Sequence, residues 1–415
     1  MQNSTINQYK VLGVIGTGAY GVVLHAIDTH TRQQYAIKAI LKSRQSSRNP
    51  DGDKYSSALQ TYLEKFLGKQ ETPLQLPQLD LDALRSLTPD DMLQMPYYKE
   101  VALQLRVQRH ANIVTIHEVL DSPHVTFIVM DYFRRDLFTS IVDDQHFAAD
   151  GQLIKRVFLQ ICSALQYCHD QGVSHCDIKP ENLLLDDDDN VYLCDFGLAS
   201  TDRCLKPNVS VGSPYYMAPE RLSIDTSLCM EYPTSKSDIW SLGIILINLA
   251  CMRNPWLKAH TVEDITFQHF CRNSKVLLKL LPVSEEFYNL LCKVLRISPL
   301  ERINLHSLMF EVSQLQSFTK DGPLHKVGVI HYEEINDEAY YATPQIGSGV
   351  SGATTIFRSA SIQTLFDVGY DKSDPSYSEN IQSTCTSDND DGLSKDFYPP
   401  YGLPQPNKHT DSINV

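Results

Sequence analysis

The sequence HCDIKPEN at 175–182 decides how the rest of the chain is interpreted. It places a carboxylate, an amine and an amide close together in one loop. Asp177 can accept or orient a hydroxyl proton, Lys179 can screen a phosphoryl group during transfer, and Asn182 can give an oxygen ligand to Mg²⁺. A lone aspartate in a loop is usually a solvated surface acid, but that interpretation leaves the ordered set unexplained. The stretch therefore predicts phosphoryl-transfer chemistry.

The sequence DFG at 195–197 follows after two short apolar runs. Asp195 would join Asn182 as a second oxygen ligand for the metal ion. The two runs flank the acidic stretch 186–189 and predict a short hairpin that returns the chain to the same site. The acidic stretch resembles part of a calcium loop, but it lacks the later glycine and glutamate. A solvated turn is therefore predicted there.

Residues 9–41 alternate apolar and polar positions around turns, which predicts an antiparallel meander of three strands. The first turn reads GTGAYG at 16–21. In a dinucleotide-binding fold such glycines open a helix, but here VVLHAI at 22–27 follows and suits a strand. This excludes a dinucleotide-dependent oxidoreductase. The glycines are placed in a hairpin that either covers phosphate groups with its backbone or is an ordinary turn.

Lys38 lies in the apolar strand predicted at YAIK, 35–38. An ammonium buried there needs an anion, because an unpaired buried charge is costly. Glu100, at the edge of a core-facing helix predicted at 97–109, is the leading carboxylate. A strand-edge lysine exposed to solvent is the alternative that this residue alone leaves open.

The composition excludes several classes of protein. The 415 residues include 36 basic and 50 acidic side chains, and a net charge of −14 argues against a nucleic-acid binder. No apolar run reaches the ~20 residues of a membrane span, and the first residues lack a secretion signal. The ten cysteines form no C-x-x-C pair and are expected to be reduced thiols. A cytosolic or nuclear location is expected.

The chain divides into unequal parts. Residues 43–96 interrupt the strand pattern and are interpreted as an insertion, partly helical and partly loop. Strands at 114–119 and 125–131 and a mostly helical region follow, with helices predicted at Ile154–Cys168 and Ser237–Met252. From about 319 the chain becomes acidic, and 320–415 contain 6 basic against 14 acidic residues. This predicts a disordered tail, which is either inert or carries a partner segment such as Thr354–Val368.

These motifs resemble those of eukaryotic protein kinases from about Tyr9 to Phe310, in order and with fitting spacings. APE at 218–220 adds another kinase motif. DIWSLG, which begins at Asp238, resembles the helix whose aspartate supports the catalytic loop. Arg302 resembles the arginine that pairs with the APE glutamate.

The resemblance implies an α+β, bilobal protein-kinase fold. Its domain would span 9–318, with a β-rich N-lobe at 9–132, a helical C-lobe at 133–318 and the tail at 319–415.

The resemblance also implies the roles of individual residues. ATP would be the phosphate donor, bound with Mg²⁺. Asp177 would be the catalytic base, assisted by Lys179, and Asn182 and Asp195 would hold the metal ions. Lys38 would pair with the phosphates and with Glu100. The residues expected at the nucleotide are Ile15, Gly16, Gly18, Gly21, Val23, Ala36, Lys38, Glu100, Met130, Asp131, Phe133, Leu184 and Asp195.

Within the nucleotide site, the stretch 130–133 would be the hinge that contacts adenine. Val23, Ala36 and Leu184 would enclose the base. Lys179 and the sequence GSPYY at 212–216 are similar to those of serine/threonine kinases.

Further segments resemble a fungal subfamily linked to nutrient sensing and to restraint of meiosis, among them MPYYKEVALQLRV at 95–107. The substrates would be serine and threonine hydroxyls of proteins. Asp136 and Glu181 match positions that read basic residues before the acceptor, with solvated acids as the alternative. A pseudokinase scaffold is disfavoured because the ion-pair, base and metal positions are all present.

Two residues depart from the kinase pattern. Cys176 replaces an arginine that usually binds an activation-loop phosphate, so we expect activity without a phosphate in 195–220. Gln104 stands where an apolar residue is usual. A helix shifted by one residue would bring Leu103 or Leu105 to that position.

Overall fold

The computed structural model describes residues 3–18, 21–42, 52–68, 73–148, 150–204, 212–222 and 232–320. All of them lie in one compact unit, Met1–Val368. The predicted tail beyond 320, with its segment Thr354–Val368, lies outside the described residues, as do Ala19 and Tyr20 of the glycine-rich turn.

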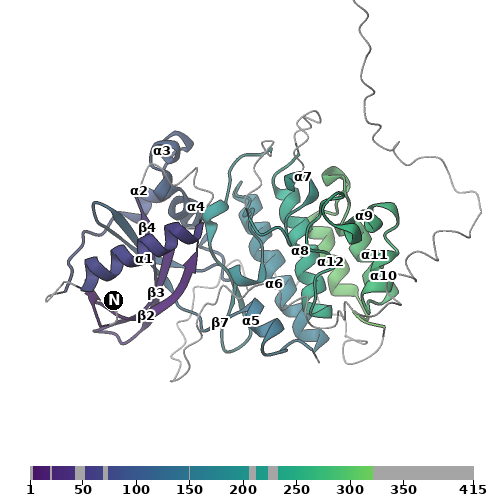
Figure 1. The fold of residues 1–415 in the computed structure, drawn as a ribbon, viewed down its shortest axis with the longest axis horizontal. Coiled ribbons are helices and arrows are strands. Elements are labelled where there is room, and N and C mark those ends of the chain that lie inside the picture. The colour runs from purple at the N-terminus through teal and green to yellow at the C-terminus, as the bar shows by residue number, and fades with distance from the viewer. Residues whose placement is uncertain are drawn as a thin grey trace, which may run out of the picture. The chain divides into compact units, whose positions relative to one another are not determined.

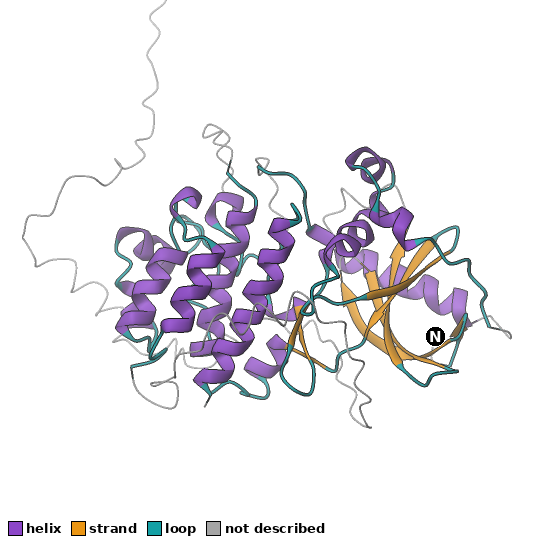
Figure 2. Ribbon diagram, turned by 180° about the vertical axis from the view of Figure 1, so that it is seen from behind, coloured by secondary structure: helices purple, strands orange, loops and turns teal. Residues whose placement is uncertain are grey.

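The N-lobe contains a six-stranded antiparallel sheet in the order β1-β2-β3-β4-β6-β5. Figure 2 shows these strands in orange at one end of the described chain and the larger helices at the other. The predicted meander is confirmed, since β2, β3 and β4 pair in sequence. The strands are β1 Thr5–Ile6, β2 Tyr9–Gly18, β3 Gly21–Asp28, β4 Gln34–Leu41, β5 Ile116–Asp121 and β6 Val125–Asp131.

The glycine-rich turn joins β2 to β3 and is followed by a strand, as predicted. Gly21 has φ +156°, and a Cβ there would lie 2.5 Å from the backbone oxygen of Ala39 on β4. Only glycine therefore lets β3 approach the strand that contains Lys38 so closely.

The insertion is partly helical, as predicted, and contains α1 Gly52–Gly68, α2 Leu81–Arg85 and α3 Pro89–Gln94. Leu59, Leu63 and Leu67 of α1 follow one another at four-residue spacing, and their burial against the sheet explains the apolar period. The insertion is thus part of the N-lobe core.

Residues 73–79 of the insertion connect the two edges of the sheet. The backbone of Leu74 bonds to Thr5 and Asn7 beside β1, at 2.9 and 2.7 Å. Further along, Leu79 N donates to Val119 O at 2.8 Å on β5. This connection is not apparent in the sequence, where the segment reads as a Pro/Leu-rich loop.

The sequence predicts a helix at 97–109. In the structure this stretch begins with a 3₁₀ turn, η1 Pro96–Tyr98, and the α-helix, α4, spans Lys99–Val107. The helix ends with Gln108 as its C-cap, and the Gln108 side chain accepts from Ile116 N at 2.8 Å. The next strand, predicted at 114–119, is β5 at 116–121. Val114 N instead bonds to Leu193 O, which draws 114 away from β6.

The C-lobe is mostly helical, and Figure 1 shows α6 and α8 near its middle. Helix α8 is buried on all sides, which fits its apolar sequence. A three-stranded sheet of β7 Arg135–Asp136, β8 Leu183–Leu185 and β9 Val191–Leu193 includes the predicted hairpin. The helices are α5 Leu137–Val142, α6 Gly151–Asp170, α7 Pro219–Leu222, α8 Ser235–Cys251, α9 Ile265–Arg272, α10 Val276–Leu280, α11 Glu285–Val294 and α12 Leu305–Gln314. The 3₁₀ turns are η2 Pro180–Asn182, η3 Phe196–Leu198 and η4 Pro299–Glu301.

Among the described residues, no helix is both long enough and apolar enough to cross a membrane.

Candidate active site

Lys38 on β4 joins two carboxylates from distant parts of the chain. Its Nζ lies 2.6 Å from Glu100 Oε1 on α4 and 2.8 Å from Asp195 Oδ1. Burial alone would lower the pKa of Lys38, but the two carboxylates outweigh it and raise this pKa above its usual value. Only 7% of Lys38 is exposed, so the solvent-exposed alternative is wrong.

The two carboxylates differ in their electrostatics. Burial raises the pKa of Glu100 above its usual value despite the nearby ammonium. Burial also disfavours the charge of Asp195, but Lys38 overcomes it and lowers the pKa of Asp195 to about 2. Asp195 is therefore fully ionised at neutral pH.

The catalytic-loop residues are also brought together. Lys179 Nζ lies 2.7 Å from Asp177 Oδ2, and Asn182 Nδ2 donates to the Asp177 backbone oxygen at 2.9 Å. Ser213 N approaches Asp177 Oδ1 at 3.4 Å. A Cβ at Gly212, which has φ +125°, would lie 3.2 Å from that same oxygen. The segment before APE therefore passes close to the candidate base.

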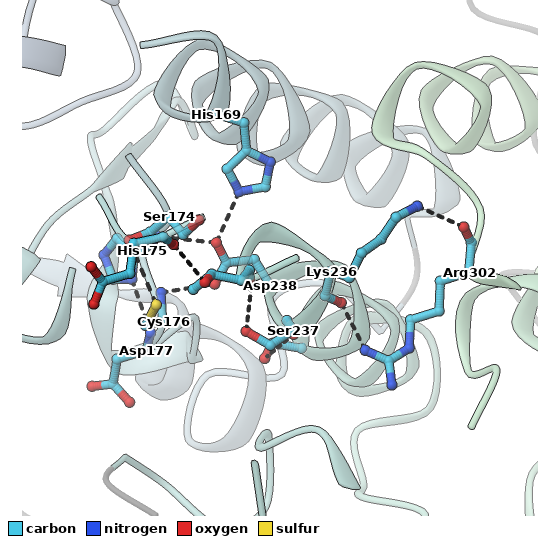
Figure 3. A network of polar contacts seen from close by, with 12 residues as sticks. His169, Ser174, His175, Cys176, Asp177, Lys236, Ser237, Asp238 and Arg302 are labelled. Carbon is cyan, nitrogen blue, oxygen red and sulfur yellow. Dashed lines mark hydrogen bonds and ion pairs between the residues drawn. The ribbon is translucent and has the colours of Figure 1, made fainter. Parts of the chain in front are cut away.

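Asp238 supports this loop, as the resemblance implied (Figure 3). Its carboxylate accepts from the backbone N–H groups of His175 and Cys176, at 2.9 and 2.8 Å. Cys176 has φ +66°, an unfavourable conformation for a residue with a side chain, and these two bonds hold it. His169 Nε2 lies 2.9 Å from the same carboxylate.

Backbone and ring contacts connect the catalytic loop to DFG. His175 Nε2 donates to Cys194 O at 3.0 Å, and Cys194 N donates to Asn182 O at 3.0 Å. The rings of His175 and Phe196 pack edge to face, with centroids 4.9 Å apart. Asn182 and Asp195 are thereby fixed relative to each other.

The Glu220–Arg302 pair implied by the resemblance is present. The guanidinium contacts both carboxylate oxygens, at 2.6 and 2.5 Å, and Arg302 lies 5.0 Å from the centre of the Trp240 ring. A bidentate pair buried to this extent fixes the APE segment to Arg302, the residue that follows η4.

The residues expected around adenine come from both lobes. Ile15 lies on β2, Val23 on β3, Ala36 on β4 and Leu184 on β8. Gly16 and Gly18 lie at the end of β2, before the turn.

The hinge stretch ends β6 and continues to Phe133, whose ring packs on Tyr192 at 4.3 Å. The Asp131 carboxylate is directed elsewhere: His117 Nε2 lies 2.6 Å from it and Thr115 N donates to it at 3.0 Å. Asp131 can therefore offer a ligand only its backbone.

The donor set suits Mg²⁺ with ATP. The amide nitrogen of Asn182 faces Asp177, which leaves its amide oxygen available as a metal ligand. Among the described residues no three His, Cys, Asp or Glu side chains gather as a metal cage. Mg²⁺ is commonly held by one or two protein oxygens together with substrate phosphates, so two protein ligands are sufficient.

Sequence reasoning missed the role of Gln104 and the presence of His169 in the site. Gln104 is 2% exposed, and its Nε2 donates to Val114 O at 2.8 Å. Leu103, not Leu105, belongs to the same apolar cluster as Phe196, which selects between the two alternatives. His169 could have been anticipated, because the predicted helix ends near it, just before HCDIKPEN.

The fold and the site define a protein kinase. A model of the protein kinase domain matches residues 84–312, and the chain belongs to this family. It is a serine/threonine protein kinase, in agreement with its named relatives.

The serine/threonine-protein kinases SKS1 and VHS1 of Saccharomyces cerevisiae are 50% and 51% identical to it. The alignments cover 80% and 78% of this chain, and 70% and 74% of those proteins. The negative regulator of sexual conjugation and meiosis of Schizosaccharomyces pombe is 34% identical, over 75% of this chain and 61% of that protein.

Proposed function

We propose that this kinase transfers the γ-phosphate of Mg²⁺-bound ATP to serine and threonine hydroxyls with Asp177, Lys179, Asn182, Lys38 and Asp195. The observation that carries the proposal is the Lys38 ammonium held between Glu100 and Asp195. Bound Mg²⁺ would neutralise phosphate charge, and the protein would position the groups around it.

Each side chain has a part in this proposal. Asp177 would accept the hydroxyl proton of the substrate, because its carboxylate is held between Lys179 and Ser213 N. Lys179 would stabilise charge on the phosphoryl oxygens. Asn182 and Asp195 would hold the metal, and Glu100 would orient Lys38.

The test measures Mg²⁺-dependent transfer from labelled ATP to a generic basic protein. We expect Asp177→Asn to lower kcat by roughly 10²–10⁴-fold, the usual contribution of a general base. Asp195→Ala should abolish transfer. Asp187→Asn, in the exposed turn of the hairpin, is the control and should behave as wild type. Equal signals from wild type and Asp195→Ala would support a scaffold instead.

We also propose a preference for basic residues two or three positions before the acceptor. Among the described residues, one carboxylate oxygen of Glu181 is buried and has no hydrogen-bond partner. Burial raises the pKa of Glu181; the nearby Lys179 ammonium opposes this effect, and the acids Asp136 and Asp177 add to it. A substrate arginine would pair with these carboxylates.

Peptide arrays can test this preference. Glu181→Gln and Asp136→Asn should reduce selection of arginine at those positions. Asparagine keeps the cap that Asp136 forms on Thr139 N at 2.7 Å, so helix α5 should persist. A wild-type profile without basic enrichment would refute the preference.

The relatives suggest a setting. One relative is a carbon catabolite-derepressing protein kinase of Saccharomyces cerevisiae, 31% identical, and another restrains conjugation and meiosis. We infer a role in nutrient signalling or meiotic control, in the cytosol or nucleus. Phosphoproteomes of wild type and Asp195→Ala cells after a glucose shift would identify the substrates.

A further inference from the structure

The outer surface of α4, the helix that contains Glu100, is covered by the chain's own insertion. We propose that residues 73–95, here called the brace, hold α4 in the position that forms the Lys38–Glu100 pair, and that Arg106 is a positioning residue for catalysis. This inference rests on the proposed role of that pair. Figure 1 shows α2 and α3 close to α4 in the N-lobe.

Apolar side chains of the brace belong to the same core clusters as residues of α4. Leu84 of α2 is 6% exposed and belongs to one cluster with Val101 and Leu105 of α4. Met92 of α3 is 5% exposed and belongs to a second cluster with Leu103 and Phe196. The brace therefore shares core with α4 and with the DFG segment.

Two arginines add reciprocal hydrogen bonds. Arg106 of α4 donates to Leu87 O at 2.5 Å and to Arg85 O at 3.3 Å in the brace. Arg85 in turn donates through Nε to Leu105 O at 3.0 Å. Guanidinium donors make such bonds stronger than neutral ones and fix their direction.

The brace is itself firmly attached. Asp80 caps α2, accepting from Asp82 N at 2.9 Å, and Thr88 and Asp91 form a capping box on α3. Upstream, residues 74–79 bond to the backbones of β1 and β5. Asn7 binds both backbone groups of Leu76, at 3.0 and 2.7 Å. An outward movement of α4 would therefore break contacts to an element fixed at both edges of the sheet.

The inner side of α4 is held as well. Gln104 Nε2 bonds to Val114 O, and Gln108 accepts from Ile116 N. Glu100 lies in the first turn of this short helix and Arg106 in its last, so a helix clamped at Arg106 also fixes Glu100. Kinases commonly control activity through the placement of this helix, and in this chain the insertion supplies contacts that place it.

The test compares Arg106→Ala and Arg106→Lys in the full chain. We expect Arg106→Ala to lower kcat about tenfold and to raise KM for ATP, with faster hydrogen exchange in 99–107. Arg106→Lys keeps the positive charge but not the forked geometry of the guanidinium. Its kcat and KM for ATP should lie between those of wild type and Arg106→Ala. Leu93→Ala, on α3 with 80% of its surface exposed, is the matched control and should match wild type.

Rates are normalised to the amount of folded protein, measured by circular dichroism. If Arg106→Ala does not fold, Arg106→Lys replaces it in the comparison with wild type. Faster exchange in α4 with unchanged kcat and KM would overturn the proposal, and so would equal losses in Leu93→Ala. Lys38→Met separates the two ideas. If it remains active, the proposed function fails; if it is inactive while Arg106→Ala equals wild type, only the brace fails.

Discussion

At position 110 a buried imidazole is held in one tautomer. His110 Nδ1 accepts from Asn112 N at 3.1 Å, so the proton lies on Nε2, which donates to Ser163 Oγ at 3.1 Å. Burial lowers the pKa of His110 to about 4. Protonation of Nδ1 would break the bond to Asn112 and leave a charge in the core.

This arrangement predicts acid sensitivity. Between pH 6.5 and 4 the unfolded chain binds a proton at His110 that the folded chain does not, so the free energy of unfolding falls with falling pH. The loss from pH 7 to 5 should be about 2 kcal/mol. Urea unfolding at both pH values tests it. His110→Gln should show a smaller difference between the two pH values, whereas the surface variant His30→Gln should match wild type; an unchanged difference in His110→Gln would contradict the assignment.

At the scale of elements, the insertion helix α1 contributes to stability. Leu63 is fully buried between α1 and the sheet. Leu63→Ala should lower the free energy of unfolding by about 2–5 kcal/mol, because it leaves a cavity in the N-lobe core. Glu64→Ala, one residue further on the exposed face, is the control. If thermal unfolding shows equal stability for both variants, α1 is not packed as described.

Sequence predicted some elements better than others, for physical reasons. The pair Lys38–Glu100 was expected because an ammonium buried in an apolar strand requires an anion, although Lys38 alone left a solvent-exposed strand-edge lysine open. The period of Leu59, Leu63 and Leu67 indicated a helix. Residues 73–79 have no such period, because they are held by backbone bonds to distant strands. Gln104 was interpreted as a register shift, since its acceptor, Val114 O, is a backbone atom that no side-chain pattern reveals.

At the scale of the whole molecule, the catalytic loop is held from within the C-lobe. Asp238 binds the backbone of His175 and Cys176, and Arg221 donates to the Cys176 backbone oxygen. Cys176 removes the usual cationic partner of an activation-loop phosphate. The loop conformation is therefore supported by contacts that need no phosphate.

We accordingly expect phosphatase treatment of the recombinant kinase to change its specific activity by less than about twofold. The reason is that position 176 has no arginine that could bind an activation-loop phosphate. A mock treatment with inhibited phosphatase is the control. Mass spectrometry must show that Thr201, Ser210 and Ser213 are unmodified afterwards. A collapse of the rate would show that a phosphate orders the segment by another route.

Residues 73–79, which run from β1 to β5, also cover part of the two edges of the sheet. A bare outermost strand offers unpaired N–H and C=O groups to any extended chain, and pairing of this kind starts aggregation. Here Leu74, Pro77 and Leu79 bond to the two outermost strands of the lobe. The segment thus occupies backbone groups at both edges of the sheet that could otherwise pair with another chain.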